Sequence, residues 1–84
     1  MSMSVEQFLS LSDAEQLQTI KDLNDIGQEE IIIDVLTGVG IDNLSVPLLS
    51  ELGRAYNNNG NEKEAIKVLE SIDEEYRDAV WYYR

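Results

Sequence analysis

The sequence predicts an all-α fold of about five helices, joined by short connections into antiparallel hairpins. Apolar residues recur at helical spacing in five successive segments, and capping serines or glycines stand between those segments. The densest apolar run, "IIIDVL" at residues 31–36, is also compatible with a buried strand. No other segment resembles a partner strand, and a lone strand cannot satisfy its backbone hydrogen bonds, so we assign this run to a helix.

The first two helices are predicted from a short apolar segment and a capping box. Residues 5–11 should form one or two helical turns. The side chains of this segment that should fold back on the core are Phe8, Leu9 and Leu11. Ser12 then opens the sequence "SDAE", in which the Ser12 hydroxyl and the Glu15 carboxylate each accept from a backbone N–H group. The apolar stripe of the helix at 13–25 consists of Leu17, Ile20, Leu23 and Ile26.

A glycine turn separates this helix from the next one. Gly27 stands where a left-handed C-cap is favoured. The following helix starts at Glu29 and Glu30, because the helix dipole favours negative charge in a first turn. Gly38 and Gly40 should close it. The residues expected to face inward are Ile32, Ile33 and Leu36, with Ile31 and Val35 partly buried.

The C-terminal half predicts three more amphipathic helices. Ser45 can cap the first of them, and Pro47 fits its first turn. Their apolar residues are Leu48, Leu49, Leu52, Ala55 and Tyr56, then Ala65, Ile66, Leu69 and Ile72, then Tyr76, Ala79, Val80 and Tyr83. We interpret the intervening "NNNGNE" as a helix–helix bend in which Gly60 takes positive φ and Asn61 caps the next helix. A calcium loop is excluded, because its first and last ligand positions would be apolar.

The composition excludes several classes of function. A chain of 84 residues forms one domain, and it contains no cysteine and no histidine. Thiol nucleophiles and the commonest general base and metal ligands are therefore missing, and we expect no cofactor and no metal. The net charge of -11 disfavours nucleic acid and anionic membranes and favours a basic protein or peptide as partner. Without a signal peptide or a membrane-spanning run, we expect a cytoplasmic location.

An internal repeat links the two halves of the chain. Its length is the interval from Gly27 to Gly60, and aligning these glycines matches apolar with apolar at most inward positions. The stretch "LLSELGRAYNNNGNEKEAIKVLESI" resembles one unit of the tetratricopeptide repeat family. The matching residues are Leu49, Leu52, Gly53 and Tyr56 in the first helix, Gly60 at the turn, and Ala65, Ile66 and Leu69 in the second helix. Gly53 and the small Ala65 should let these two helices approach closely.

The resemblance implies a single domain over residues 1–84, built as a short right-handed array of stacked hairpins. Residues 46–79 are the best-matched repeat. Residues 1–44 resemble a degenerate helix pair with a short N-terminal helix, and residues 74–84 the opening helix of an incomplete further repeat. The family's proline near the end of the repeat is absent here, where Arg77 stands.

The resemblance also implies a peptide-binding groove on the first helix of the best-matched repeat. Its candidate binding residues are Pro47, Ser50, Arg54, Asn57 and Asn58, with Arg54 able to clamp a carboxylate. The alternative is an ordinary solvated helix face. A second surface is predicted at "AVWYYR", because one helix cannot bury three aromatic residues against a single neighbour. We therefore expect Trp81, Tyr82 and Tyr83 to mediate self-association, or to meet the next helix of a longer array.

Three functions follow, in order of support. The first is a non-enzymatic protein–protein interaction module that binds a peptide or partner protein or forms homo-oligomers through its C-terminal helix. The second is a structural end piece of a longer helical array. The third is an enzyme that uses acids alone, and its candidate carboxylates are Glu70, Asp73, Glu74, Glu75 and Asp78. We favour a solvated acidic surface for these residues over a catalytic pair.

Overall fold

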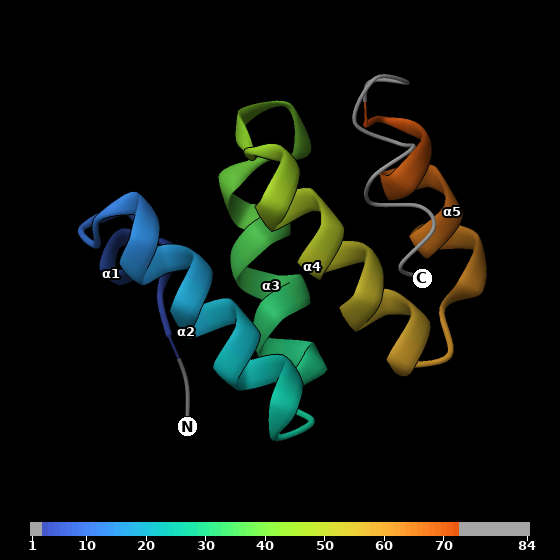
Figure 1. Cartoon of the computed structure of the whole chain (residues 1–84), viewed down its shortest axis with the longest axis horizontal. Helices are drawn as coiled ribbons and strands as arrows, with labels where there is room; N and C mark the ends of the chain where they lie inside the picture. The colour runs from blue at the N-terminus through green and yellow to red at the C-terminus, as the bar shows by residue number, and fades with distance from the viewer. Residues whose placement is uncertain (1–2, 73–84) are drawn as a thin grey trace.

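The computed structural model describes residues 3–72, whose regular secondary structure is entirely helical, with no strand. Its elements are α1 (Val5–Leu9), α2 (Asp13–Asp25), α3 (Glu29–Val39), the 3-10 turn η1 (Ile41–Asn43), α4 (Val46–Asn58) and α5 (Glu62–Glu70). The all-α prediction is therefore confirmed (Figure 1). The predicted last helix, with Trp81, Tyr82 and Tyr83, lies outside the described residues.

From α2 onward, each helix packs against the next one along the chain, and α2 also packs against α4. The short α1 packs on α3, at the N-terminal side of the molecule (Figure 1). The helices α2 and α4 are first members of successive hairpins and run in the same direction (Figure 1). This arrangement brings the equivalent ends of α2 and α4 together.

The repeat holds at the level of single backbone hydrogen bonds. Helices α2 and α4 have the same length. Their first residues are separated by the same number of positions as Gly27 and Gly60. The first residues of α3 and α5 are separated by that number as well. In the first turn Gln28 N–H donates to the Leu23 carbonyl at 2.9 Å, and in the second Asn61 N–H donates to the Tyr56 carbonyl at 2.8 Å. Both turns are therefore Schellman motifs. Gly27 and Gly60 stand at their left-handed positions, with φ of 77° and 83°.

Serine caps begin three of the helices. Ser12 and Glu15 form the predicted capping box, and Ser45 accepts from the Leu48 N–H as expected. Ser4 and Gln7 form another capping box at α1, which follows the same spacing of serine and a long polar residue. Asn61 is the N-cap residue of α5, as predicted, but its side chain makes no capping hydrogen bond.

The core lies between the helices and contains most of the predicted apolar residues. It consists of Phe8, Ile20, Leu23, Ile32, Val35, Leu36, Leu44, Leu48, Leu49, Leu52, Ala55, Tyr56, Ala65, Val68 and Ile72. Three residues expected inside are largely exposed, namely Leu9 (56%), Ile26 (63%) and Ile66 (51%). Ile26 is the C-cap of α2 and so leaves the helical stripe, while Val68 takes the inward position expected of Ile66.

The third helix differs from its prediction in two ways. Val35 is fully buried, whereas Ile33 is only partly buried, so the inward face is rotated toward Ile32, Val35 and Leu36. Gly38 lies inside α3 and does not close it; the helix ends at Val39. A Cβ at Gly38 would stand 2.5 Å from a methyl group of Val5, so this glycine is where α1 crosses α3.

The close approach predicted at Gly53 is confirmed. A Cβ built at this position would lie 3.1 Å from both Cγ and Cδ2 of Leu69, which is tighter than ordinary van der Waals contact. Gly53 is itself buried within α4, and Ala65 is buried on the facing helix α5. The Leu69 side chain of α5 therefore packs directly against the backbone of α4 at Gly53.

Gly53→Leu should lower the free energy of unfolding by about 1–2 kcal/mol, because overpacking costs more than the gain in helix propensity. Urea denaturation followed by circular dichroism measures this change. Asn57→Leu is the matched control, since it introduces the same side chain at an exposed position of the same helix. Equal stability of the two variants would contradict the close packing of α4 and α5.

Candidate interaction surface between α2 and α4

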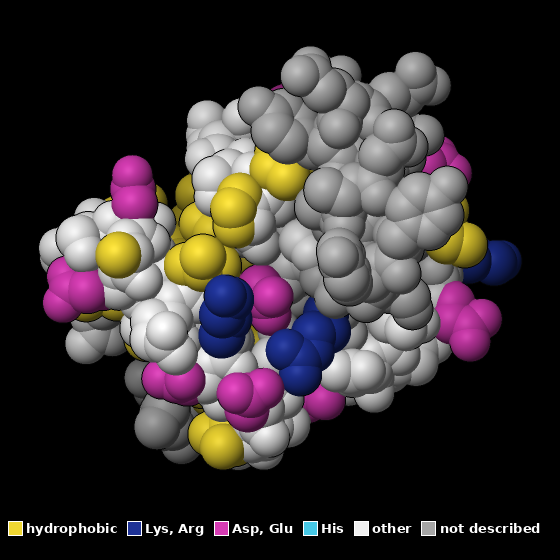
Figure 2. Space-filling model, in the orientation of Figure 1, with side chains coloured by type: hydrophobic (Ala, Val, Ile, Leu, Met, Phe, Trp, Pro, Cys, Tyr) yellow, Lys and Arg dark blue, Asp and Glu magenta, His cyan; other side chains and the backbone are white. Residues whose placement is uncertain are grey.

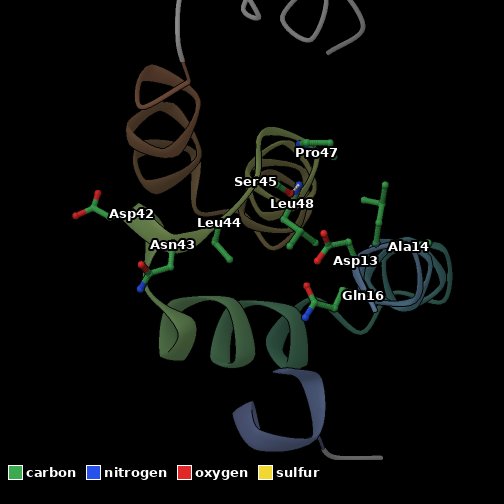
Figure 3. Close-up of a pocket in the computed structure, with 10 residues that line it drawn as sticks. Asp13, Ala14, Gln16, Asp42, Asn43, Leu44, Ser45, Pro47 and Leu48 are labelled. Carbon is green, nitrogen blue, oxygen red and sulfur yellow. Dashed lines mark hydrogen bonds between the residues drawn. The ribbon is translucent and has the colours of Figure 1, made fainter. Parts of the chain in front are cut away.

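A hollow of about 640 Å³ lies between the N-terminal parts of α2 and α4. It is lined by Asp13, Ala14, Gln16 and Leu17 of α2, by Asp42, Asn43, Leu44 and Ser45 of the connection, and by Pro47 and Leu48 of α4. Figure 3 shows Leu44 and Leu48 pointing into the space between the helices, with the Asp13 carboxylate facing them from α2. The hollow thus has an apolar floor and a polar wall.

Serine caps position the two sides of this hollow. The Ser12 hydroxyl accepts from the Glu15 N–H at 3.3 Å, and the Glu15 carboxylate accepts from the Ser12 N–H at 3.0 Å. The Ser45 hydroxyl accepts from the Leu48 N–H at 3.4 Å. Because Ser12 and Ser45 are separated by one repeat length, the repeat places two equivalent helix starts next to each other.

Two side-chain amides at the hollow donate hydrogen bonds to nearby backbone carbonyls and so hold the segments around it in place. The Gln16 side chain donates to the carbonyls of Phe8 and Leu11, at 3.2 and 3.3 Å, and so ties the α1–α2 connection to α2. The Asn43 side chain donates to the Val39 carbonyl at 2.9 Å and holds the turn after α3. The frame around the hollow is therefore set by internal hydrogen bonds.

The carboxylates of Asp13 and Asp42 are left without a partner within residues 3–72. Neither makes a hydrogen bond or an ion pair there, and both side chains are exposed. Asp13 points toward the middle of the hollow, whereas Asp42 points outward from the opposite rim (Figure 3). No lysine or arginine of the described residues lines the hollow. Figure 2 shows apolar side chains gathered between the upper parts of α2 and α4 on this face.

A polar cluster joins the C-terminal end of α2 to the middle of α4. The Asn24 side chain donates to the backbone carbonyl of Glu51 at 3.2 Å and to its carboxylate at 3.0 Å. Arg54 bridges onward, at 3.5 Å from the Glu51 carboxylate and 3.3 Å from that of Asp25. Asn24 is only 5% exposed, and its side-chain oxygen has no hydrogen-bond partner among the described residues.

The candidate peptide-binding residues are distributed differently from the prediction. Pro47 lines the hollow. Ser50 is buried, at 8% exposure, and the guanidinium of Arg54 is engaged by Glu51 and Asp25. Asn57 and Asn58 are exposed near the other end of α4. The structure therefore does not bring these five residues together into one open groove.

Of the residues that line the hollow, only Pro47 was predicted from the sequence to belong to a binding surface. Asp13 and Leu17 were expected only as parts of the helix at 13–25. The available signal was the spacing of Ser12 and Ser45, which equals the spacing of the two turn glycines. This equality predicts that the two first turns lie side by side.

Within residues 3–72, no cluster of three or more acidic residues could hold a metal ion. No helix in the same range is long and apolar enough to cross a membrane. Most members of the predicted acidic cluster, from Asp73 onward, fall outside the described residues. The described surface thus offers hydrogen bonding, charge and apolar contact.

Comparison with known proteins finds no family model, no curated protein and no solved structure that matches this chain. The resemblance to the tetratricopeptide repeat family therefore rests on the residues themselves. Any inference about function depends on the geometry of the α2–α4 surface.

The buried amide should contribute more to stability than the ion pairs beside it. Asn24→Ala removes two hydrogen bonds in a buried site, and we expect a loss of about 1–3 kcal/mol of unfolding free energy. Arg54→Ala should cost less than about 1 kcal/mol, because the ion pairs of Arg54 are reached by solvent. Urea denaturation compares the two variants, and the reverse order would show that charge pairing joins the helices here.

The cap beside the hollow should weaken in acid. Hydrogen bonding by the Ser12 backbone N–H, and next by its hydroxyl, lowers the pKa of the Glu15 carboxyl. A lowered folded-state pKa stabilises the protein above the unfolded value, about 4.3, and this contribution disappears as the pH falls through the folded pKa. Carboxyl titration by NMR should give a lowered pKa for Glu15. Ser12→Ala removes the hydroxyl but keeps the backbone N–H, so the pKa should return only part of the way toward its ordinary value. A Glu15 pKa at the ordinary value in the unaltered protein would contradict the assignment.

Proposed function

We propose that this chain is a non-enzymatic protein–protein interaction module of tetratricopeptide type, and that a segment of its partner lies in the hollow between α2 and α4. The observation that carries the proposal is the hollow itself. Its floor is apolar, and the two carboxylates at its edges have no internal partner within residues 3–72. An interaction surface of this kind combines an apolar contact with a few polar groups that fix orientation.

Binding is favoured over catalysis by the chemistry of the lining residues. The nucleophiles and bases available there are two aspartates and one serine, and the Ser45 hydroxyl is used as a helix cap. Asp13 and Asp42 point in different directions (Figure 3). Acid–base catalysis needs two groups that face one reacting atom in a protected cleft. The hollow offers a surface for contact, and its described residues include no convergent pair.

The tetratricopeptide interpretation is supported by the two hairpins. Their helix starts, turn glycines and turn hydrogen bonds repeat at one common interval. In such an array, the first helices of successive hairpins stand side by side and form one face. The pair α2 and α4 forms this face here, and Pro47, predicted from the resemblance to touch a peptide, lies at its edge.

Filling the hollow should weaken peptide binding. Peptides selected from a displayed random library against the whole chain would be titrated into ¹⁵N-labelled protein, with Ala14 and Leu17 amides as reporters. Ala14→Trp places a large ring at an exposed position of the lining, and we expect affinity to fall at least about tenfold.

Asn58→Trp is the matched control, because it adds the same ring at an exposed site of α4 outside the hollow. Wild-type affinity is expected for this variant. If binding is lost in Asn58→Trp and kept in Ala14→Trp, the partner lies on the other end of α4. If no library peptide binds, the structural end piece of a longer array becomes the better explanation.

A further inference from the structure

We infer that the segment bound in this hollow is cationic: a peptide that places lysine or arginine beside an apolar side chain. This inference rests on the proposed function and names the chemistry of its partner. It is carried by charge complementarity. The apolar floor has no lining cation among residues 3–72, and Asp13 points into the hollow without a partner in the same range.

The apolar residues that line the hollow indicate that the partner carries an apolar side chain. Leu44 and Leu48 belong to the core but reach the hollow, Leu17 is half-buried, and Pro47 is exposed. A side chain that covers these groups removes apolar surface from water, which favours binding in proportion to the area covered. A wholly polar segment would leave this surface wet, so the partner must carry at least one apolar anchor.

The charged part of the partner is specified by Asp13. Its carboxylate faces the space between α2 and α4 at the start of α2 (Figure 3). A lysine or arginine that lies across Leu48 can place its stem on the apolar floor and its charged end at this carboxylate. Asp42, on the opposite rim, offers a second charge to a basic residue further along the peptide.

The helix starts do not reverse this preference. Two helix N-termini meet at the hollow, and each carries roughly half a positive charge. Ser12 with Glu15, and Ser45, already accept hydrogen bonds from those first turns. The two full carboxylate charges therefore outweigh the partial charges of the helix starts. The net charge of -11 acts in the same direction, because it steers cations toward the chain and repels anions.

Three short peptides of one length test the inference: alternating leucine with lysine, with glutamate, and with glutamine. Each is titrated into the ¹⁵N-labelled whole chain, and the Ala14, Leu17 and Leu48 amides report on the hollow. We expect only the lysine peptide to shift these amides strongly, and its affinity to fall as salt rises. Asp13→Asn with Asp42→Asn should weaken it about fivefold to tenfold.

The matched control separates local from total charge. Glu30→Gln with Asp34→Asn neutralises two exposed carboxylates on α3, outside the hollow, and should change affinity less than about twofold. Equal weakening by the two double variants would overturn the inference, because attraction would then come from the whole chain. Stronger shifts from the glutamate or glutamine peptide would overturn it and leave the proposed function standing. Shifts of the hollow amides by none of the three peptides would overturn both.

Discussion

The reversal of the chain at two left-handed glycines is the constraint on which the rest of this structure depends. Gly27 and Gly60 end their helices with the same pair of backbone hydrogen bonds, one repeat length apart. A side chain at either position would meet the steric cost of positive φ. Each of these turns reverses the chain, so the two reversals return it to its first direction. Helices α2 and α4 therefore run in the same direction, and their N-terminal ends lie next to each other (Figure 1).

That alignment gives the α2–α4 surface two different ends. Between the C-terminal end of α2 and the middle of α4, the Asn24 side chain donates to Glu51, and Arg54 connects this pair to Asp25. The buried Asn24 amide fixes the register between α2 and α4. If one helix shifted along the other, the amide N–H groups would lose their hydrogen bonds, and the amide oxygen already lacks a partner among the described residues. At the N-terminal ends of α2 and α4, the hollow remains between the two helices. One end of the surface therefore fixes the geometry, and the other end remains available for contact.

Most of the fold could be predicted from the sequence because its determinants are local. The serine caps, the turn glycines and the apolar spacing identified the bounds of α2 and the nesting at Gly53. The wrong predictions concern residues whose position depends on packing against another helix. Gly38 is needed where α1 contacts α3 and not at a helix end, and Val68 is buried while Ile66 is exposed. The site was harder to predict, since the exposure of Ser50 and the pairing of Arg54 depend on contacts between segments far apart in sequence.

The physics that starts a helix also accounts for the hollow. A first turn favours serine at the cap, an acid near the dipole and proline where an N–H is dispensable, and these residues are short or charged. Ser12, Asp13, Ser45 and Pro47 follow these preferences, so two adjacent first turns cannot fill the space between them as mid-helix leucines do. The dipole preference also keeps lysine and arginine out of the same turns. A repeat that aligns two helix starts therefore produces an underfilled, acidic surface with core leucines beneath it, and a basic segment with an apolar side chain has the complementary composition.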